Sequence, residues 1–247
     1  MSMGVTMNSA FWGEFAGTAV LMLLGNGVVA CVVLKQSYGH GSGWIVITTG
    51  WCFAVMAGVF TALAVGSHAH LNPAVTIGVA LATGKWSEVP VYIAAQLLGA
   101  MSGAFLVWLH YLPHWSVTED ARGKRACFCT APAIKHVPAN LLSEIIGTFV
   151  LVFVAAAIFS HRVAPAGLAP GMGPFVVACL VWSIGLSLGG PTGYAINPAR
   201  DLGPRMVHAL IPLAGKGSSE WDYALIPVVG PIIGAVLAGT LVRFIAI

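Results

Sequence analysis

The sequence contains Asn-Pro-Ala twice, as Asn72-Pro73-Ala74 and as Asn197-Pro198-Ala199, 125 positions apart. Asn is favoured just before a helix, Pro is favoured in the first helical turn, and a small Ala lets another helix end approach closely. Each copy therefore predicts the start of a short helix. A helix start presents unpaired N–H groups and roughly half a positive charge. Two such starts facing each other would bind neutral hydroxyl groups and repel cations.

The side chains of Asn72 and Asn197 add hydrogen-bond donors to this junction. Each amide oxygen can cap its own helix and leave the NH2 group facing the lumen, where one passing hydroxyl oxygen can accept from both side chains. An oxygen that accepts on both sides does not easily relay a proton along a chain of water molecules. We therefore expect the junction to pass neutral solutes and to exclude charge, protons included.

The elements that position these residues must lie in a membrane. Charged residues make up 8% of the 247 residues and apolar residues 58%, and the mean hydropathy is +0.89. Soluble globular domains carry about 25% charged residues. So few charges could not cover an aqueous surface, which excludes the class of soluble globular proteins.

Stretches without Asp, Glu, Lys or Arg divide the chain into membrane segments. A helix needs about 20 residues to cross the hydrocarbon. The two longest stretches, 36–84 and 163–199, are too long for one span. Each carries Asn-Pro-Ala near its end. One full span plus one half-length helix fits both. We predict half-helices at 72–83 and 197–210, and full spans at 10–34, 44–65, 89–112, 141–161, 172–190 and 223–245.

An internal repeat supports this division. Glu14-Phe15-Ala16-Gly17-Thr18 in the first span recurs as Glu144-Ile145-Ile146-Gly147-Thr148 in the fourth, an offset of 130 positions. Each copy contains three spans and one half-helix, and an odd number of crossings makes the second copy enter from the opposite side. We predict one transmembrane channel domain over 1–247, with repeat one at about 8–112, a connecting loop at about 113–140 and repeat two at about 141–247.

Five motifs follow one another along the chain: Glu14 with Gly17-Thr18, His70-Leu71-Asn72-Pro73-Ala74-Val75-Thr76, Gln96 with Gly99, Glu144 with Gly147-Thr148, and Gly193-Tyr194-Ala195-Ile196-Asn197-Pro198-Ala199-Arg200-Asp201-Leu202-Gly203-Pro204. Over the whole chain, this order resembles the major intrinsic proteins, the aquaporin family. Asp201, Arg205 and Pro227 further resemble the glycerol facilitator branch, the aquaglyceroporins. The resemblance implies an all-α membrane protein, aquaporin-like, with six transmembrane helices and two half-helices, and it implies a homotetramer.

Arg200 is the only Lys or Arg between positions 163 and 202. A cation inside a membrane segment costs about 3 kcal/mol or more, so Arg200 is a functional candidate; the alternative is an Arg that reaches the membrane interface. The resemblance makes it the donor of a selectivity filter, with Trp51, Gly185 and Tyr194 as its partners. Arg200 would bind the hydroxyl edge of a polyol while the two aromatic rings cover its carbon edge, and Gly185 would leave the constriction wide.

The assignment of Trp51 requires one inserted residue. Trp51 lies 21 positions before Asn72, whereas the family pattern is one residue shorter, so an ungapped alignment would select Cys52. Residues 51–56 match the family's span when the extra residue is placed near Gly66-Ser67-His68. A loop before a half-helix tolerates a change of length better than a packed span does.

Glu14 and Glu144 are carboxylates inside predicted spans. A buried carboxylate is costly unless it accepts hydrogen bonds, and irregular backbone at membrane depth needs partners. We expect each to hold the loop before a half-helix, with a proton relay as the alternative. His70 is expected to hydrogen-bond that loop rather than to bind a metal with His68, because no Cys, Asp or Glu accompanies the pair. Asp201 is expected to be a further residue that supports the site, with Glu14, Glu144 and His70.

Loop charges oppose the orientation that the family implies, in which both termini are cytoplasmic. Cations are usually enriched in the inner loops. The inner loops would hold Lys85, Arg162 and Arg243, and the outer loops Lys35, Arg122, Lys124, Arg125, Lys135, Arg205 and Lys216. We keep the family orientation, and we expect the cluster Arg122, Lys124 and Arg125 to be a solvated loop face.

These observations predict a passive channel for glycerol and similar small neutral solutes with some water, and with urea or metalloid hydroxides as further solutes. The alternative is a mainly water-selective aquaporin. We expect no enzyme activity, because the spans hold no pair of catalytic carboxylates, no nucleophile with a base and no metal cluster. No cofactor, metal or nucleic acid is expected. The partner is the lipid bilayer, with the chain multi-pass in the plasma (inner) membrane.

Overall fold

The structure is a computed structural model that describes residues 6–247, so the first five positions of the predicted channel domain lie outside the described residues. This part of the chain is helical and contains no strand. The helices are α1 (Met7–Val33), α2 (Trp44–Val65), α3 (Pro73–Thr83), α4 (Val89–His110), α5 (Leu112–Val117), α6 (Ala121–Ala126), α7 (Val137–Phe159), α8 (Met172–Leu188), α9 (Pro198–Leu210) and α10 (Ile226–Ile245).

Five helices of the described chain are long and apolar enough to cross a membrane, namely α1, α2, α4, α7 and α10. The remaining predicted span, α8, is apolar but has only 17 residues, which corresponds to roughly 25 Å of helix. The largest boundary difference is at α7, which begins at Val137 rather than at 141. The side chain of His136 accepts a hydrogen bond from the Ala139 amide there, and Pro138 favours a first helical turn.

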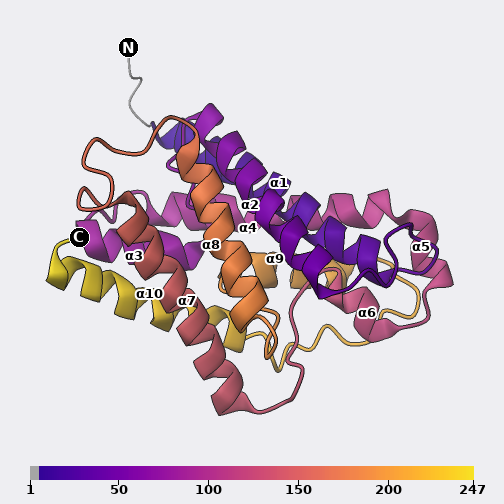
Figure 1. Ribbon diagram of the computed structural model, residues 1–247. Coiled ribbons are helices and arrows are strands. Elements are labelled where there is room, and N and C mark those ends of the chain that lie inside the picture. The colour runs from indigo at the N-terminus through magenta and orange to yellow at the C-terminus, as the bar shows by residue number, and fades with distance from the viewer. Residues whose placement is uncertain (1–5) are drawn as a thin grey trace.

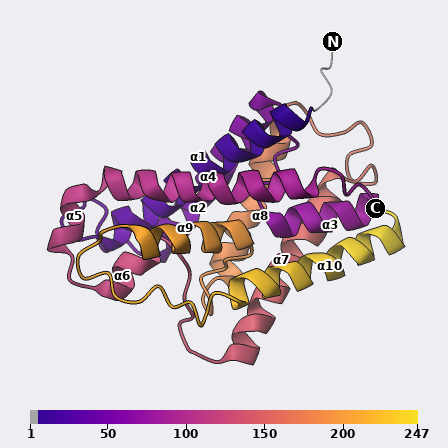
Figure 2. The same cartoon turned by 180° about the vertical axis from the view of Figure 1, so that it is seen from behind.

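The two short helices α3 and α9 begin at the Asn-Pro-Ala segments. Figure 2 shows them in line with each other between the long helices α4 and α10. α3 packs against α10, and α9 packs against α4, so each half-helix leans on a span from the other half of the chain. The long helices pair in a matching way, α1 with α2 and α4, and α7 with α8 and α10. Half-helices held in this way are screened from lipid by full spans.

Glycine allows equivalent close crossings in the two halves. A Cβ on Gly99 of α4 would overlap the carbonyl oxygen of Phe15 on α1, and a Cβ on Gly234 of α10 would overlap that of Ile145 on α7. Phe15 and Ile145 are themselves 130 positions apart, the offset of the repeat. Small residues at such crossings let helix backbones approach closely in a membrane.

The connection between the halves is folded rather than a plain loop, because it contains α5 and α6. The expectation of a solvated basic face is wrong for two of its three residues. Lys124 is 3% exposed and its Nζ donates to the carbonyl of Ala214 at 2.6 Å. Arg125 is 6% exposed and forms an ion pair with Glu220 at 3.0 Å. The segment between α9 and α10 covers this side of the connection, and a local charge pattern does not show such a distant partner.

Two cysteines of the connection, Cys127 and Cys129, are buried and unpaired. Burial, together with the nearby negative charge of Asp201, raises the pKa of the Cys129 thiol to about 12. Burial also raises the pKa of the Cys127 thiol far above its usual range. Both groups are therefore neutral thiols near pH 7, and they pack as small apolar side chains.

The start of α1 and the end of α10 lie at one end of the molecule, and α5 and α6 lie at the other (Figure 1). The long helices run between these two ends. The connection between the halves therefore covers the face opposite the termini.

Candidate functional site

A cavity of about 660 Å³ is lined by residues of both half-helix starts, among them Asn72 and Asn197. Trp51, Tyr194 and Arg200 line one end of it, and Thr83 and His161 line the other. The Asn-Pro-Ala junction lies between these ends, so the cavity has the shape of a path through the centre of the helix bundle.

Asn72 and Asn197 occupy the N-cap positions of α3 and α9. The Oδ1 atom of Asn72 accepts from the Ala74 amide at 2.9 Å. The Oδ1 atom of Asn197 accepts from the amides of Ala199 at 3.0 Å and Arg200 at 3.2 Å. Pro73 and Pro198 occupy the first helical position that follows each cap.

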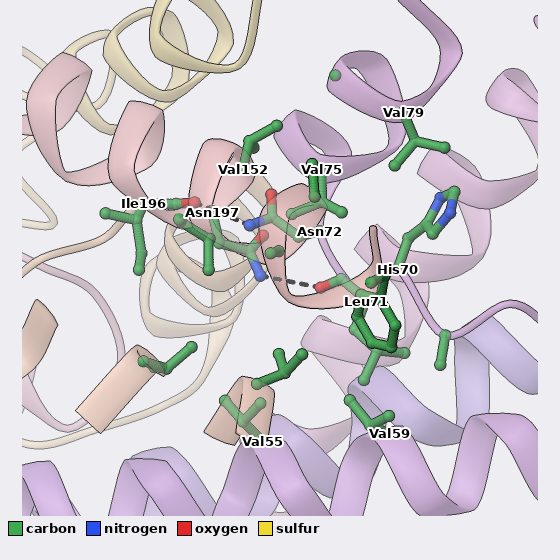
Figure 3. Close-up of a pocket in the computed structure, with 18 of the residues that line it drawn as sticks. Val55, Val59, His70, Leu71, Asn72, Val75, Val79, Val152, Ile196 and Asn197 are labelled. Carbon is green, nitrogen blue, oxygen red and sulfur yellow. Dashed lines mark hydrogen bonds between the residues drawn. The ribbon is translucent and has the colours of Figure 1, made fainter. Parts of the chain in front are cut away.

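The two Asn side chains also bind across the junction. Asn72 Nδ2 donates to the carbonyl of Ile196 at 2.8 Å, and Asn197 Nδ2 donates to the carbonyl of Leu71 at 2.9 Å. The dashed lines in Figure 3 mark these two bonds. One N–H of each amide, rather than both, is then left for the lumen. This reciprocal pairing fixes the two helix starts against each other.

The backbone before each half-helix is in an unusual conformation. Leu71 and Ile196 have φ values of 53° and 42°, and Ala69 and Tyr194 have 57° and 38°. A residue other than Gly in this left-handed region costs about 1–3 kcal/mol and persists only where its surroundings hold it. In return, the conformation turns the carbonyls of Leu71 and Ile196 toward the opposite Asn side chain.

Glu14 of α1 holds the first of these loops. Its Oε1 accepts from the Ser67 hydroxyl and from the His70 amide at 2.9 Å, and its Oε2 accepts from the Leu71 amide at 2.7 Å. Gln96 Nε2 donates to the same Oε2 at 2.7 Å. The carboxylate is fully buried, and four hydrogen bonds compensate for its loss of water.

Glu144 of α7 holds the second loop in the same manner. Its two oxygens accept from the amides of Ala195 at 3.0 Å and Ile196 at 2.8 Å. Like Glu14, it is fully buried. Each buried carboxylate thus fixes the residue that precedes a capping Asn.

The four residues predicted for the filter lie together. The Cζ atom of Arg200 is 4.2 Å from the centre of the Trp51 ring, a cation–π contact. A Cβ on Gly185 would come within 2.7 Å of Tyr194 Cζ, so Gly185 provides the room for that ring. Trp51, rather than Cys52, is therefore the residue of α2 that lies against Arg200.

Three further residues contact this group without having been predicted. Arg200 Nη1 donates to the carbonyl of Phe128 at 3.2 Å and to Asn26 Oδ1 at 3.4 Å. Trp44 Nε1 donates to the Gly185 carbonyl at 3.1 Å. Asn26 carried a sequence signal, because it is a lone amide in an apolar span. Phe128 and Trp44 carried none, since only the tertiary fold brings them here.

His70 and Asp201 lie beside the path rather than at its centre. His70 Nδ1 is 3.2 Å from Thr76 Oγ1 of α3. Asp201 is fully buried and accepts from Thr130 at 2.8 Å (amide) and 2.7 Å (hydroxyl) and from Arg205 at 2.8 Å and 3.0 Å. Within residues 6–247, no group of three His, Cys, Asp or Glu side chains is placed to hold a metal ion.

Comparisons of the sequence with known proteins match one family. The sequence profile described as Major intrinsic protein matches residues 2–242. The chain is 55% identical over 238 residues to the "Probable glycerol uptake facilitator protein" of Thermotoga maritima, covering 96% of this chain and 99% of that one. It is 53% identical over 234 residues to the "Glycerol uptake facilitator protein" of Bacillus subtilis, covering 94% and 82%.

The fold is also similar to a solved structure. The X-ray structure of the aquaglyceroporin from Plasmodium falciparum superposes with a TM-score of 0.86 at 29% identity, covering 98% of this chain and 97% of that one. Together with the apolar helices, this similarity shows an all-α membrane protein with the aquaporin-like fold. The chain belongs to the Major intrinsic protein family, whose members are channels and not enzymes.

Proposed function

We propose that this chain is a passive membrane channel through which glycerol and similar small neutral solutes diffuse, together with some water, while ions and protons are excluded. The observation that carries the proposal is the placement of the Arg200 guanidinium against the Trp51 ring, next to Gly185 and Tyr194. The names of the relatives support glycerol as the solute. Urea and metalloid hydroxides are further candidates of similar size and polarity.

The two walls of the cavity suit the two edges of a polyol. Figure 3 shows Val55 and Val59 across from the Asn pair as an apolar wall, and Val75, Val79 and Val152 also line the cavity. The remaining N–H groups of Asn72 and Asn197 offer hydrogen bonds on the other side. A glycerol molecule can therefore replace its lost water on one edge and bury its carbon atoms on the other, whereas water gains nothing from the apolar wall.

The test of this function is light scattering of proteoliposomes under water and glycerol gradients, with the wild-type channel and Gly185→His. We expect wild-type glycerol flux well above that of empty liposomes. His at position 185 has no room beside Tyr194, so it is expected to lower glycerol flux roughly tenfold or more relative to water flux. A wild-type channel that passes water but not glycerol would favour the water-selective alternative.

Exclusion of charge is attributed to two features of the site. Two helix N-termini face each other at the Asn pair, and Arg200 adds a full positive charge near one end of the path. Arg200→Val is expected to allow a small proton leak and to leave most of the exclusion intact, because the helix starts remain. The measurement is the response of a pH-sensitive dye in liposomes with matched channel density. An unrestricted proton flow in the variant would show that Arg200 alone forms the barrier.

We also propose that both termini are cytoplasmic, in the plasma membrane. The unfavourable count of cations in the outer loops weakens once burial is considered. Of the seven outer cations, Lys124, Arg125 and Arg205 are buried, and Lys216 Nζ donates to three backbone carbonyls at the end of α9. Three exposed cations are then left on each side, so the loops no longer oppose the orientation.

The assembly is proposed to be a homotetramer, with repeat one at about 8–112, the connection at about 113–140 and repeat two at about 141–247. The matched helix pairs of the two halves support the repeat. The site residues of the path all come from one chain, so each subunit would form its own path.

A further inference from the structure

Asn26 is a polar residue in the C-terminal third of the apolar helix α1, and its side chain is fully buried. Its Oδ1 atom is 3.4 Å from Arg200 Nη1, 174 positions away along the chain. Arg is a donor only, so the oxygen of the amide is the atom that must face it. The contact joins α1 to the filter group described above.

The contact decides which edge of the guanidinium faces the path. Nη1 carries two hydrogens, and it has two acceptors, Asn26 Oδ1 and the Phe128 carbonyl at 3.2 Å. Among the described residues, no side chain or carbonyl accepts from Nε or Nη2 of Arg200. Those two nitrogens are therefore the donors that remain for a solute.

Gly25, the residue before Asn26, helps to place the Trp51 ring of the same filter group. A Cβ on Gly25 would overlap the Trp51 ring. The absence of a side chain at Gly25 thus lets the ring lie close against α1, where it faces Arg200. Adjacent residues of one helix turn hold both the aromatic ring and the cation.

The cost of Asn26 argues against a role in packing alone. Its Nδ2 atom is buried and has no hydrogen-bond partner within the described chain. A buried donor without a partner destabilises a protein, and an apolar residue of similar size would avoid the penalty. Asn at position 26 supplies an acceptor for Arg200, and Leu would not.

We propose that Asn26 is a positioning residue of the filter, which fixes Arg200 so that its Nε and Nη2 edge faces the path and thereby favours a polyol over water. This inference rests on the proposed glycerol channel. Two adjacent hydroxyl groups need two donors held in a fixed geometry, whereas one water molecule needs a single donor. Loss of orientation therefore affects the polyol more than it affects water.

The experiment compares Asn26→Leu, Asn26→Asp and the control Thr18→Val in proteoliposomes at equal amounts of folded protein. Thr18 also lies on α1, is fully buried and has an unpartnered hydroxyl. We expect the ratio of glycerol to water permeability to fall about tenfold in Asn26→Leu and to stay within about twofold of wild type in Thr18→Val. Removal of a buried polar group as such would change both variants alike.

The Asp variant separates positioning from packing. A carboxylate retains the acceptor, so the permeability ratio is expected to stay near the wild-type value. Its negative charge beside Arg200 weakens the repulsion of cations, so proton leak is expected to rise. This variant also tests the inference if Asn26→Leu does not fold.

The outcomes are distinct. A wild-type channel without glycerol flux would contradict the proposed function itself. A wild-type channel that conducts glycerol, together with an unchanged ratio in Asn26→Leu, would overturn only the role of Asn26. The role of Asn26 would also be overturned if Asn26→Asp lost the wild-type ratio of glycerol to water permeability, or if its proton leak equalled that of the wild type.

Discussion

Glu14→Ala is expected to abolish most solute flux and to lower the unfolding free energy by about 3 kcal/mol or more. The substitution removes the acceptor of four donors, three of them buried, namely Ser67 Oγ, the amides of His70 and Leu71, and Gln96 Nε2. A buried donor without a partner costs about 1–3 kcal/mol. The loop would relax out of its left-handed conformation, and the Leu71 carbonyl would no longer be aimed at Asn197. Flux and thermal stability in detergent measure the two effects.

Two matched variants make this prediction specific. Glu14→Gln retains one acceptor oxygen and the side-chain shape, so a folded channel with reduced flux is expected. Glu144→Ala removes the acceptor of two amides and of the Thr192 hydroxyl, fewer donors than in Glu14→Ala, so its loss of stability is expected to be smaller. Wild-type stability in Glu14→Ala would contradict the role of the carboxylate in holding the loop. Glycerol flux that follows an imposed pH gradient in the wild-type protein would instead support a proton relay.

Arg205→Leu is expected to cost about 3–5 kcal/mol, because it leaves the carboxylate of Asp201 buried without its charged partner. Both side chains are 0% exposed. Arg205 Nη2 also donates to the carbonyl of Thr130, and its Nη1 donates to those of Ser219 and Glu220. One side chain thus joins the connection between the halves, α9 and the segment that precedes α10. Arg205→Lys cannot reproduce this fork of donors and is expected to restore little.

Lys135→Gln is the control for this ion pair. Lys135 lies 3.7 Å from Glu220 and 3.8 Å from Asp222, and its side chain is 64% exposed. Exposed pairs contribute about 0–1 kcal/mol, so the midpoint of thermal unfolding is expected to change little. Equal losses in Arg205→Leu and Lys135→Gln would show that burial of the Arg205 pair does not determine its contribution.

The spans and half-helices could be predicted because local chemistry determines them. Stretches without charge fix which residues lie in the membrane, and Asn followed by Pro fixes where α3 and α9 begin. The prediction for α8, for example, began at the observed residue, Met172, and ended two residues late. Such features need no knowledge of distant parts of the chain.

The contacts that complete the candidate site could not be predicted in the same way. The Phe128 carbonyl reaches Arg200 from 72 positions away, and Lys124 reaches Ala214 from 90 positions away. A basic cluster looks the same in sequence whether water or a covering loop surrounds it. Asn26 was not predicted either, although it carried a signal, since an amide within an apolar span is unusual enough to indicate a partner elsewhere.

The crossed bonds between the two Asn side chains have a consequence for how the protein is made. Asn72 binds Ile196, and Asn197 binds Leu71, across 124 and 126 positions of chain. During synthesis the first half enters the membrane before these partners exist. Its half-helix start then lacks the carbonyl that completes it, and α3 lacks α10 as its packing neighbour. The conducting path is therefore among the last features to form. A nascent chain that stops short of Asn197 does not form a complete channel in the membrane.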